Sequence, residues 1–212
     1  GDHGRKSSNS PKKVMIKGLK IRNLEKIKRL DKMAEAVYKV PATYNQAPLP
    51  DVTLGKLRAK IKANDGVYDE TNSVDYSNRS VTGEIKYSRD AFLTSVKRYT
   101  DSQQWYWDSY EAQVPYWGWT SWHNNKNKPR KFIRFIHNSG EGHTRYVADK
   151  VYKKVPDQHS VYNSNWTVLV GTMEGDEWLS DRNRAGKPRV VFDLSIPTAY
   201  TKEWEKMISL IN

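Results

Sequence analysis

Histidine and asparagine residues in the middle of the chain have the types and spacing that could support hydrolysis of a phosphodiester bond. His123 ends a predicted strand, Asn138 follows the next predicted strand, and His143 stands at the start of a predicted helix. A histidine can take a proton from an attacking water, and imidazole and amide groups can hold a divalent ion against a phosphate. These three residues are the catalytic candidates if the protein is an enzyme.

The order strand, strand, helix is that of the ββα-metal nucleases. The spacing departs from it, because the loop between the strands is short, Asn138 and His143 lie close in sequence, and no acidic ligand is near. The alternative interpretation is that these are surface histidines without a catalytic function, in a basic loop rich in Trp and His. A metal-dependent nuclease or toxin domain is therefore kept as an alternative, and we assign no metal site and no cofactor.

A second set of candidates is acidic. Glu84 and Lys86 have the Glu-x-Lys spacing of many DNA endonucleases, and Asp69 or Asp75 could supply the second carboxylate for Mg²⁺. In a chain with 28% charged residues this spacing is common by chance. We therefore expect solvated side chains here.

Aromatic residues with a polar atom are abundant, with eight Trp and thirteen Tyr against four Phe. Several of them gather between residues 105 and 122, close to Lys128 and Arg130. Such a cluster suits either a stacking surface for single-stranded nucleic acid or an interface between subunits. The residues that we predict at a subunit interface are Trp105, Trp107, Tyr116, Trp117, Trp119 and Trp122.

Positive charge is concentrated at the start of the chain. The first 40 residues hold twelve Lys and Arg against four Asp and Glu, which is +8 of the formal net charge of +12. The natural partner of such a surface is a polyanion, although a solvated, solubilising face is an equal alternative. The residues that we predict to face nucleic acid are Lys12, Lys13, Arg22, Lys26, Arg29, Lys56, Arg58, Lys60 and Lys62.

Other classes are excluded by composition. The chain has no Cys, which excludes a disulfide scaffold, a thiolate zinc site and a cysteine nucleophile. No apolar run approaches the roughly 18 residues needed to cross a bilayer. We therefore expect no membrane partner.

The predicted elements mix helices and strands without βαβ alternation. Apolar residues at helical spacing predict helices over residues 23–40, from 88 to before Pro115, over 144–154, and from Thr201 onward. The predicted strands are 14–19, 52–63, 81–87, 117–122, 131–136, 166–170 and 189–194. The expected fold is α+β, a mixed or antiparallel sheet packed by two or three helices. A basic flexible arm (residues 1–13) precedes a single domain (14–212).

The first elements resemble a family of phage proteins. Residues 14–19 (VMIKGL) precede a basic amphipathic helix, and Ala47-Pro48 is followed by Gly55, Leu57, Arg58 and Ile61. This order is similar to that of the tail-completion and head-tail joining proteins of long-tailed bacteriophages. The likeness covers about the first 60 residues, and residues 156–212 would be an extension that is atypical of the family.

The resemblance implies a structural virion protein rather than an enzyme. It would form a homo-oligomeric ring beside neighbouring virion proteins, assemble in the host cytoplasm, and contact DNA non-specifically through its basic surface. A nucleic-acid-binding or capsid-like protein with a basic arm is a further alternative, besides the nuclease.

Overall fold

The computed structural model describes residues 16–40, 83–113, 119–123, 128–138, 140–148, 151–158, 165–174 and 177–212. The predicted arm and the predicted strand at residues 52–63 lie outside these ranges. So do Lys12, Lys13, Lys56, Arg58, Lys60 and Lys62.

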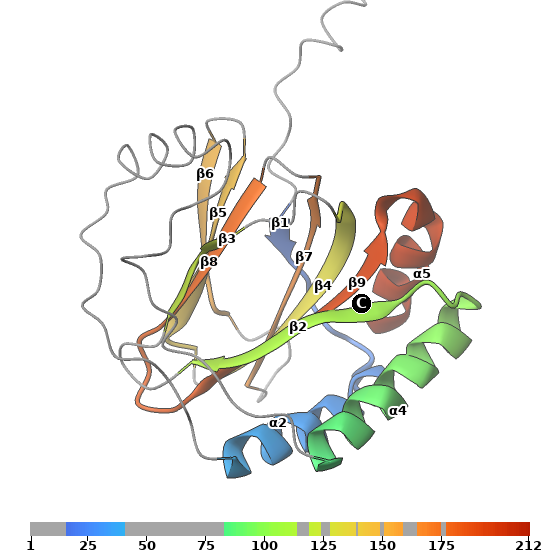
Figure 1. Ribbon diagram of the computed structural model, residues 1–212, viewed down its shortest axis with the longest axis horizontal. Coiled ribbons are helices and arrows are strands. Elements are labelled where there is room, and N and C mark those ends of the chain that lie inside the picture. The colour runs from blue at the N-terminus through green and yellow to red at the C-terminus, as the bar shows by residue number, and fades with distance from the viewer. Residues whose placement is uncertain are drawn as a thin grey trace, which may run out of the picture.

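A five-stranded antiparallel sheet forms the middle layer (Figure 1). In spatial order its strands are β1 (Ile16–Gly18), β7 (Trp166–Met173), β4 (Arg130–His137), β9 (Arg189–Pro197) and β2 (Tyr106–Gln113). β4 lies at the centre, where Phe135 pairs with Val168 of β7 and Phe192 of β9. Strands from the C-terminal part of the chain thus flank the central strand on both sides.

A four-stranded antiparallel sheet covers one face of the middle layer. In spatial order its strands are β3 (Trp119–His123), β8 (Glu177–Asn183), β5 (Gly142–Ala148) and β6 (Val151–Pro156).

The helices cover the opposite face (Figure 1). They are the short 3₁₀ helix η1 (Leu24–Lys26), α2 (Arg29–Lys39), α4 (Gly83–Thr100), the 3₁₀ turn η3 (Thr198–Tyr200) and α5 (Thr201–Ile211). The molecule therefore has three layers: helices, a five-stranded sheet and a four-stranded sheet.

Each interface between layers has its own hydrophobic core. Alternate residues of a strand face opposite sides of a sheet, so Ile133 and Phe135 of β4 pack with the helices. Phe132 and Ile136 of the same strand pack with Tyr146 of the four-stranded sheet. The middle sheet is buried on both faces, which explains why β7 and β9 are almost continuously buried.

The predicted α+β class, with antiparallel strands and helices packed on a sheet, is confirmed. The strands predicted at 117–122, 131–136, 166–170 and 189–194 correspond to β3, β4, β7 and β9, and the helix from Thr201 is α5. The helix predicted over 23–40 is formed by η1 followed by α2.

Three predictions of secondary structure were wrong. Residues 81–87 do not form a strand, because Gly83 begins α4, whose buried face includes Ile85, Phe92 and Val96. The helix predicted from residue 88 to before Pro115 is too long, because residues 106–113 form β2. Helix α4 ends at Thr100, where Asp101 adopts a left-handed φ of 51° and the Ser102 N–H bonds to the Lys97 carbonyl at 3.0 Å. The helix predicted over 144–154 is instead the antiparallel pair β5 and β6.

Candidate functional site

Residues 16–40, which follow the predicted arm, lie on the surface and are held in place by buried apolar side chains and by backbone hydrogen bonds. Within residues 16–40 the apolar side chains Ile27, Leu30 and Val37 are almost fully buried. Its backbone is tied to other elements, since the Leu19 N–H bonds to the Val168 carbonyl at 2.8 Å and the Arg22 N–H to the Ile211 carbonyl at 3.0 Å. The segment is therefore held against both the sheet and α5.

Most cations of this segment face solvent. The exposed ones are Lys17, Lys20, Arg22, Lys28, Arg29, Lys32 and Lys39. Lys39 lies 3.7 Å from Glu84 in an exposed ion pair, whose stabilising effect is small. We name this surface, residues 16–40 with these seven cations, the basic segment.

Arg22, Lys26 and Arg29, which we predict to face nucleic acid, do not lie on one continuous α-helix. A 3₁₀ helix replaces the first α-helical turn, and the α-helix begins only at Arg29. The Lys26 ammonium lies 3.8 Å from the centre of the Tyr99 ring, in a cation–π contact with α4. Arg22 and Arg29 stay exposed, whereas Lys26 is half-buried.

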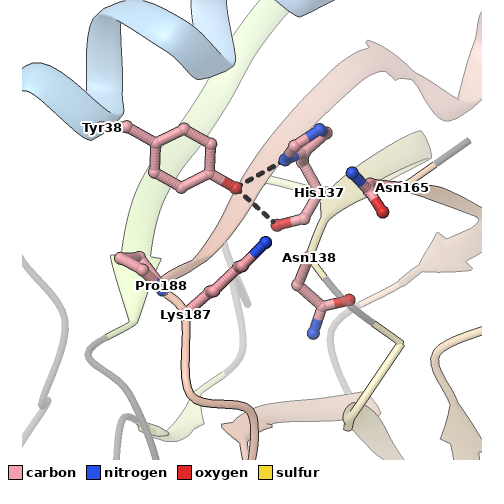
Figure 2. Close-up of a pocket in the computed structure, with 6 residues that line it drawn as sticks. All are labelled: Tyr38, His137, Asn138, Asn165, Lys187 and Pro188. Atoms are coloured by element: carbon pink, nitrogen blue, oxygen red, sulfur yellow. Dashed lines mark hydrogen bonds between the residues drawn. The ribbon is translucent and has the colours of Figure 1, made fainter.

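A pocket of about 390 Å³ opens next to the C-terminal end of α2. Its lining residues come from α2, the end of β4, the start of β7 and the loop before β9. They are Tyr38, His137, Asn138, Asn165, Lys187 and Pro188 (Figure 2).

Tyr38 and His137 form a hydrogen-bonded pair at the wall of this pocket. The Tyr38 hydroxyl lies 2.5 Å from His137 Nδ1 and 3.3 Å from the His137 carbonyl oxygen. Either the hydroxyl donates to Nδ1, or Nδ1–H donates to the hydroxyl, which then donates to the carbonyl. The His137 ring meets the Trp166 ring edge-on with 4.7 Å between centres, and Trp166 Nε1 donates to Asp31 at 2.7 Å.

Asn138 connects the pocket to a buried ionic network between the two sheets. Its amide nitrogen donates to Asp157 Oδ2 at 2.9 Å, and its amide oxygen accepts the Gly140 N–H at 2.9 Å. Asn138, predicted as a metal or phosphate contact, is buried and holds the loop after β4 in place.

Arg189 is at the centre of the network and is fully buried. It forms two hydrogen bonds with Asp157, from Nε at 2.8 Å and from Nη2 at 2.9 Å, and one with Asp181 at 2.9 Å. Burial alone would lower the pKa of Arg189, but Asp157 and Asp181 outweigh it and raise that pKa above its usual value. Arg189 is therefore a permanent cation between two carboxylates.

The network continues along the middle sheet. Arg134 pairs with Asp181 and lies 3.5 Å from Asp193, and Arg130 lies 2.9 Å from Asp108. Burial raises the pKa of Asp193 above its usual value, and Arg134 and Arg130 oppose this shift. We name these seven side chains the ionic layer: Arg130, Arg134, Arg189, Asp108, Asp157, Asp181 and Asp193.

His143 does not open a helix but lies within β5, where it pairs with Arg182 of β8. Burial, together with the charges of Lys154, Arg145, Arg189 and Arg184, lowers its pKa to about 3. A buried neutral histidine among cations is a poor place for a divalent ion, because these charges repel it. His123 ends β3, as predicted, and its backbone pairs with Leu179.

The acidic candidates are not brought together in the described part of the chain. Glu84 and Lys86 lie on the first turns of α4 and are exposed, whereas Asp69 and Asp75 lie outside the described residues. Among the residues that the structure describes, no group of three or more His, Asp or Glu could hold a metal ion.

Two of the predicted interface tryptophans belong to the core of this chain. Trp105 is 2% exposed and donates from Nε1 to Thr100 Oγ1 at 2.8 Å. Trp107 packs against Phe92 and Phe192 and donates to the Arg89 carbonyl at 2.9 Å. Trp119 and Trp122 lie on β3, at one edge of the four-stranded sheet, and Tyr116 and Trp117 lie outside the described residues.

Sequence reasoning did not find Tyr38 and Lys187 as pocket residues. They are far apart in the chain, and each stands in a segment whose local pattern is that of an ordinary helix end or a polar loop. No signal in the sequence relates them to one another. Asn138 was predicted as a catalytic candidate of the nuclease alternative, and His137 was not singled out.

In the described ranges, no helix is both long and apolar enough to cross a membrane. No protein-family model and no curated protein matches this chain. Among solved structures, one titled "Crystal Structure of AviO1 from Streptomyces viridochromogenes Tue57" is similar, with 12% identity and a TM-score of 0.41 over 88% of this chain and 91% of that chain. This likeness is too remote to support an argument about fold or function.

Proposed function

We propose that this protein is a structural subunit of a bacteriophage particle, of the tail-completion or head-tail connector class, which contacts DNA non-specifically. The observation that carries the proposal is the basic segment. It presents seven exposed cations on a backbone that is fixed to the sheet and to α5. The resemblance of the first 60 residues supplies the phage context.

The chemistry of the basic segment suits phosphate contacts without sequence readout. Lysine and arginine that neutralise phosphates release condensed counterions, and this gives affinity that depends on salt but not on bases. The cations of the ionic layer are already paired with buried carboxylates, so they add nothing to such a surface. Exposed cations also lie elsewhere, among them Lys154, Lys202 and Lys206, but the basic segment gathers seven of them within residues 16–40.

The nuclease alternative is less well supported by the same geometry. Of its candidates, His143 is buried next to Arg145 and Arg189, and Asn138 donates its amide hydrogen to Asp157. Neither side chain is arranged to hold a divalent ion against a phosphate. A structural function needs no such arrangement.

DNA binding by two variants with equal loss of charge tests the proposal. The first combines Arg22→Ala, Lys28→Ala and Arg29→Ala in the basic segment, and the second combines Lys154→Ala, Lys202→Ala and Lys206→Ala elsewhere. If each lost cation contacts a phosphate, the slope of log K against log salt becomes shallower by up to about 2.7 in the first variant. The second variant should keep the wild-type slope.

Equal slopes in the two variants would refute the basic segment as the DNA contact, because only net charge would then matter. Light scattering at low and high salt tests the subunit assignment. A closed oligomer that persists in high salt supports a ring. A monomer that binds DNA in every condition would instead favour the nucleic-acid-binding alternative.

A further inference from the structure

The pocket beside α2 offers a binding site that the DNA contact of the basic segment does not use. Its volume of about 390 Å³ lies in the range of about 300–1,000 Å³ that is usual for small-ligand sites. This space is too small for a duplex but suits a single nucleotide. The pocket adjoins the basic segment, because Tyr38 belongs to both.

The charge of the pocket favours an anion. None of its six lining residues is acidic, and the Lys187 amine points toward the Tyr38 hydroxyl and the His137 carbonyl (Figure 2). Asp157, the carboxylate bonded to the lining residue Asn138, also accepts two hydrogen bonds from Arg189. Asp31, behind Trp166, accepts the indole N–H at 2.7 Å. An anionic group at Lys187 therefore meets a cation and no uncompensated carboxylate among the lining residues.

The walls of the pocket suit a flat ring. The Tyr38 ring and Pro188 provide apolar faces, and bases of nucleic acids stack on aromatic side chains without strong sequence preference. Behind Tyr38, His137 rests on Trp166, so this wall is supported by packed rings. The exposed amide of Asn165 can donate and accept hydrogen bonds at the edge of a base.

We propose that this pocket binds one nucleotide, with its phosphate at Lys187 and its base against Tyr38 and Pro188. The inference rests on the proposed function for the choice of a nucleotide among flat anions. The nucleotide can be a free nucleoside monophosphate or the 5′-phosphorylated end of a DNA strand, since both present the same chemistry. Bases inside a duplex would first have to leave the stack.

Calorimetry with dAMP, deoxyadenosine and inorganic phosphate tests the pocket on the full chain. We expect dAMP to bind and Lys187→Ala to weaken it about tenfold or more, because a charge-assisted hydrogen bond is lost. Lys202→Ala removes an exposed lysine of α5 and should leave the affinity unchanged. Tyr38→Ala should weaken binding of both dAMP and deoxyadenosine.

Three results would overturn the inference: no binding of dAMP to the wild type, equal affinity in Lys187→Ala, or binding of phosphate alone as tight as that of dAMP. Competition with dAMP by a 5′-phosphorylated oligonucleotide, but not by its 5′-hydroxyl form, assigns the site to strand ends. Absence of competition assigns it to free nucleotides.

The two proposals can fail separately. If dAMP does not bind, and DNA binding by the Arg22, Lys28 and Arg29 variant shows the shallower dependence on salt, only the pocket assignment is wrong. If dAMP binds and that variant keeps the wild-type slope, the proposed DNA contact is wrong and the pocket assignment stands.

Discussion

At the scale of single residues, the arginines of β4 and β9 are buried, whereas the basic composition of the chain predicts that they are exposed. Arg130, Arg134 and Arg189 look like part of a basic surface, yet they are between 0% and 2% exposed. Their carboxylate partners come from other strands or, for Asp157, from the residue after β6, and Arg134 meets Asp181 and Asp193. A charge in a buried strand is tolerated only when it is paired and hydrogen-bonded.

Arg189→Met should strongly destabilise the protein. The change removes three hydrogen bonds to Asp157 and Asp181 and leaves Asp157 buried without a cation. Breaking a buried pair in this way costs about 3–5 kcal/mol of unfolding free energy. Urea denaturation measures the loss.

The matched control is Arg184→Met, five positions earlier, where the side chain is exposed. Its unfolding free energy should stay within about 0.5 kcal/mol of the wild type. Similar losses in both variants would show that the ionic layer does not stabilise the fold.

The sequence contains no local sign of these pairs. A strand that reads Arg-Lys-Phe-Ile-Arg-Phe-Ile-His is predicted correctly from its apolar and β-branched residues. An arginine of this strand can be buried only where the second sheet places a carboxylate next to it. That information lies in the tertiary arrangement, and the same is true of Tyr38 and Lys187 in the pocket.

At the scale of elements, helix and strand were confused where the apolar pattern fits both. Tyr146, Val147, Val151 and Tyr152 have spacings compatible with one helical face, but these β-branched and aromatic types favour strands. The opposite error occurred at residues 81–87. There Ile85, Phe92 and Val96 form one helical stripe, most of which lies beyond residue 87.

The strand β8 is not among the strands predicted from the sequence. Its sequence Glu-Trp-Leu-Ser-Asp-Arg-Asn contains few apolar residues, yet Ser180, Asp181 and Asn183 are fully buried. Asp181 is satisfied there by Arg134, Arg189 and Thr144. Hydrophobic patterning cannot find a strand whose buried face is polar.

A substitution at Gly142 tests how closely β5 is packed against β8 and the ionic layer. A Cβ at Gly142 would lie 2.7 Å from the Arg182 carbonyl oxygen and 2.8 Å from Asp157 Oδ2. Gly142→Ala should therefore cost about 1–3 kcal/mol of unfolding free energy, since the backbone of β8 has to shift. Urea denaturation of the wild type and the variant measures this difference in unfolding free energy.

Gly83→Ala is the control for that substitution. A Cβ at Gly83 meets nothing within 4 Å, and alanine favours a helix over glycine. This variant should match or exceed the wild-type stability, by up to about 1 kcal/mol. A Gly142→Ala variant as stable as Gly83→Ala would mean that β5 and β8 are more loosely packed than the structure has them.

At the scale of the whole molecule, the general class was predictable and the layering was not. The helical periods and strand runs indicate α+β, and most elements of the middle sheet follow from the sequence. The four-stranded sheet depends on β5 and β6, which were predicted as a helix, and on β8, which was not predicted. The ionic layer joins this sheet to the middle one, because Arg134 of β4 and Arg189 of β9 both pair with Asp181 of β8.

His143 should make the stability of the whole molecule depend on pH. The unfolded chain binds a proton at this histidine near pH 6.5, whereas burial and the nearby cations lower the folded pKa to about 3. Between these values the unfolded state holds more protons, so stability falls as pH falls. From pH 7 to pH 5 the contribution of this residue is a loss of about 2 kcal/mol.

His143→Gln removes the titration, and urea midpoints of both proteins at pH 7, 6 and 5 measure the difference. The wild type should lose stability more steeply than the variant, and parallel pH profiles would contradict a neutral, buried His143.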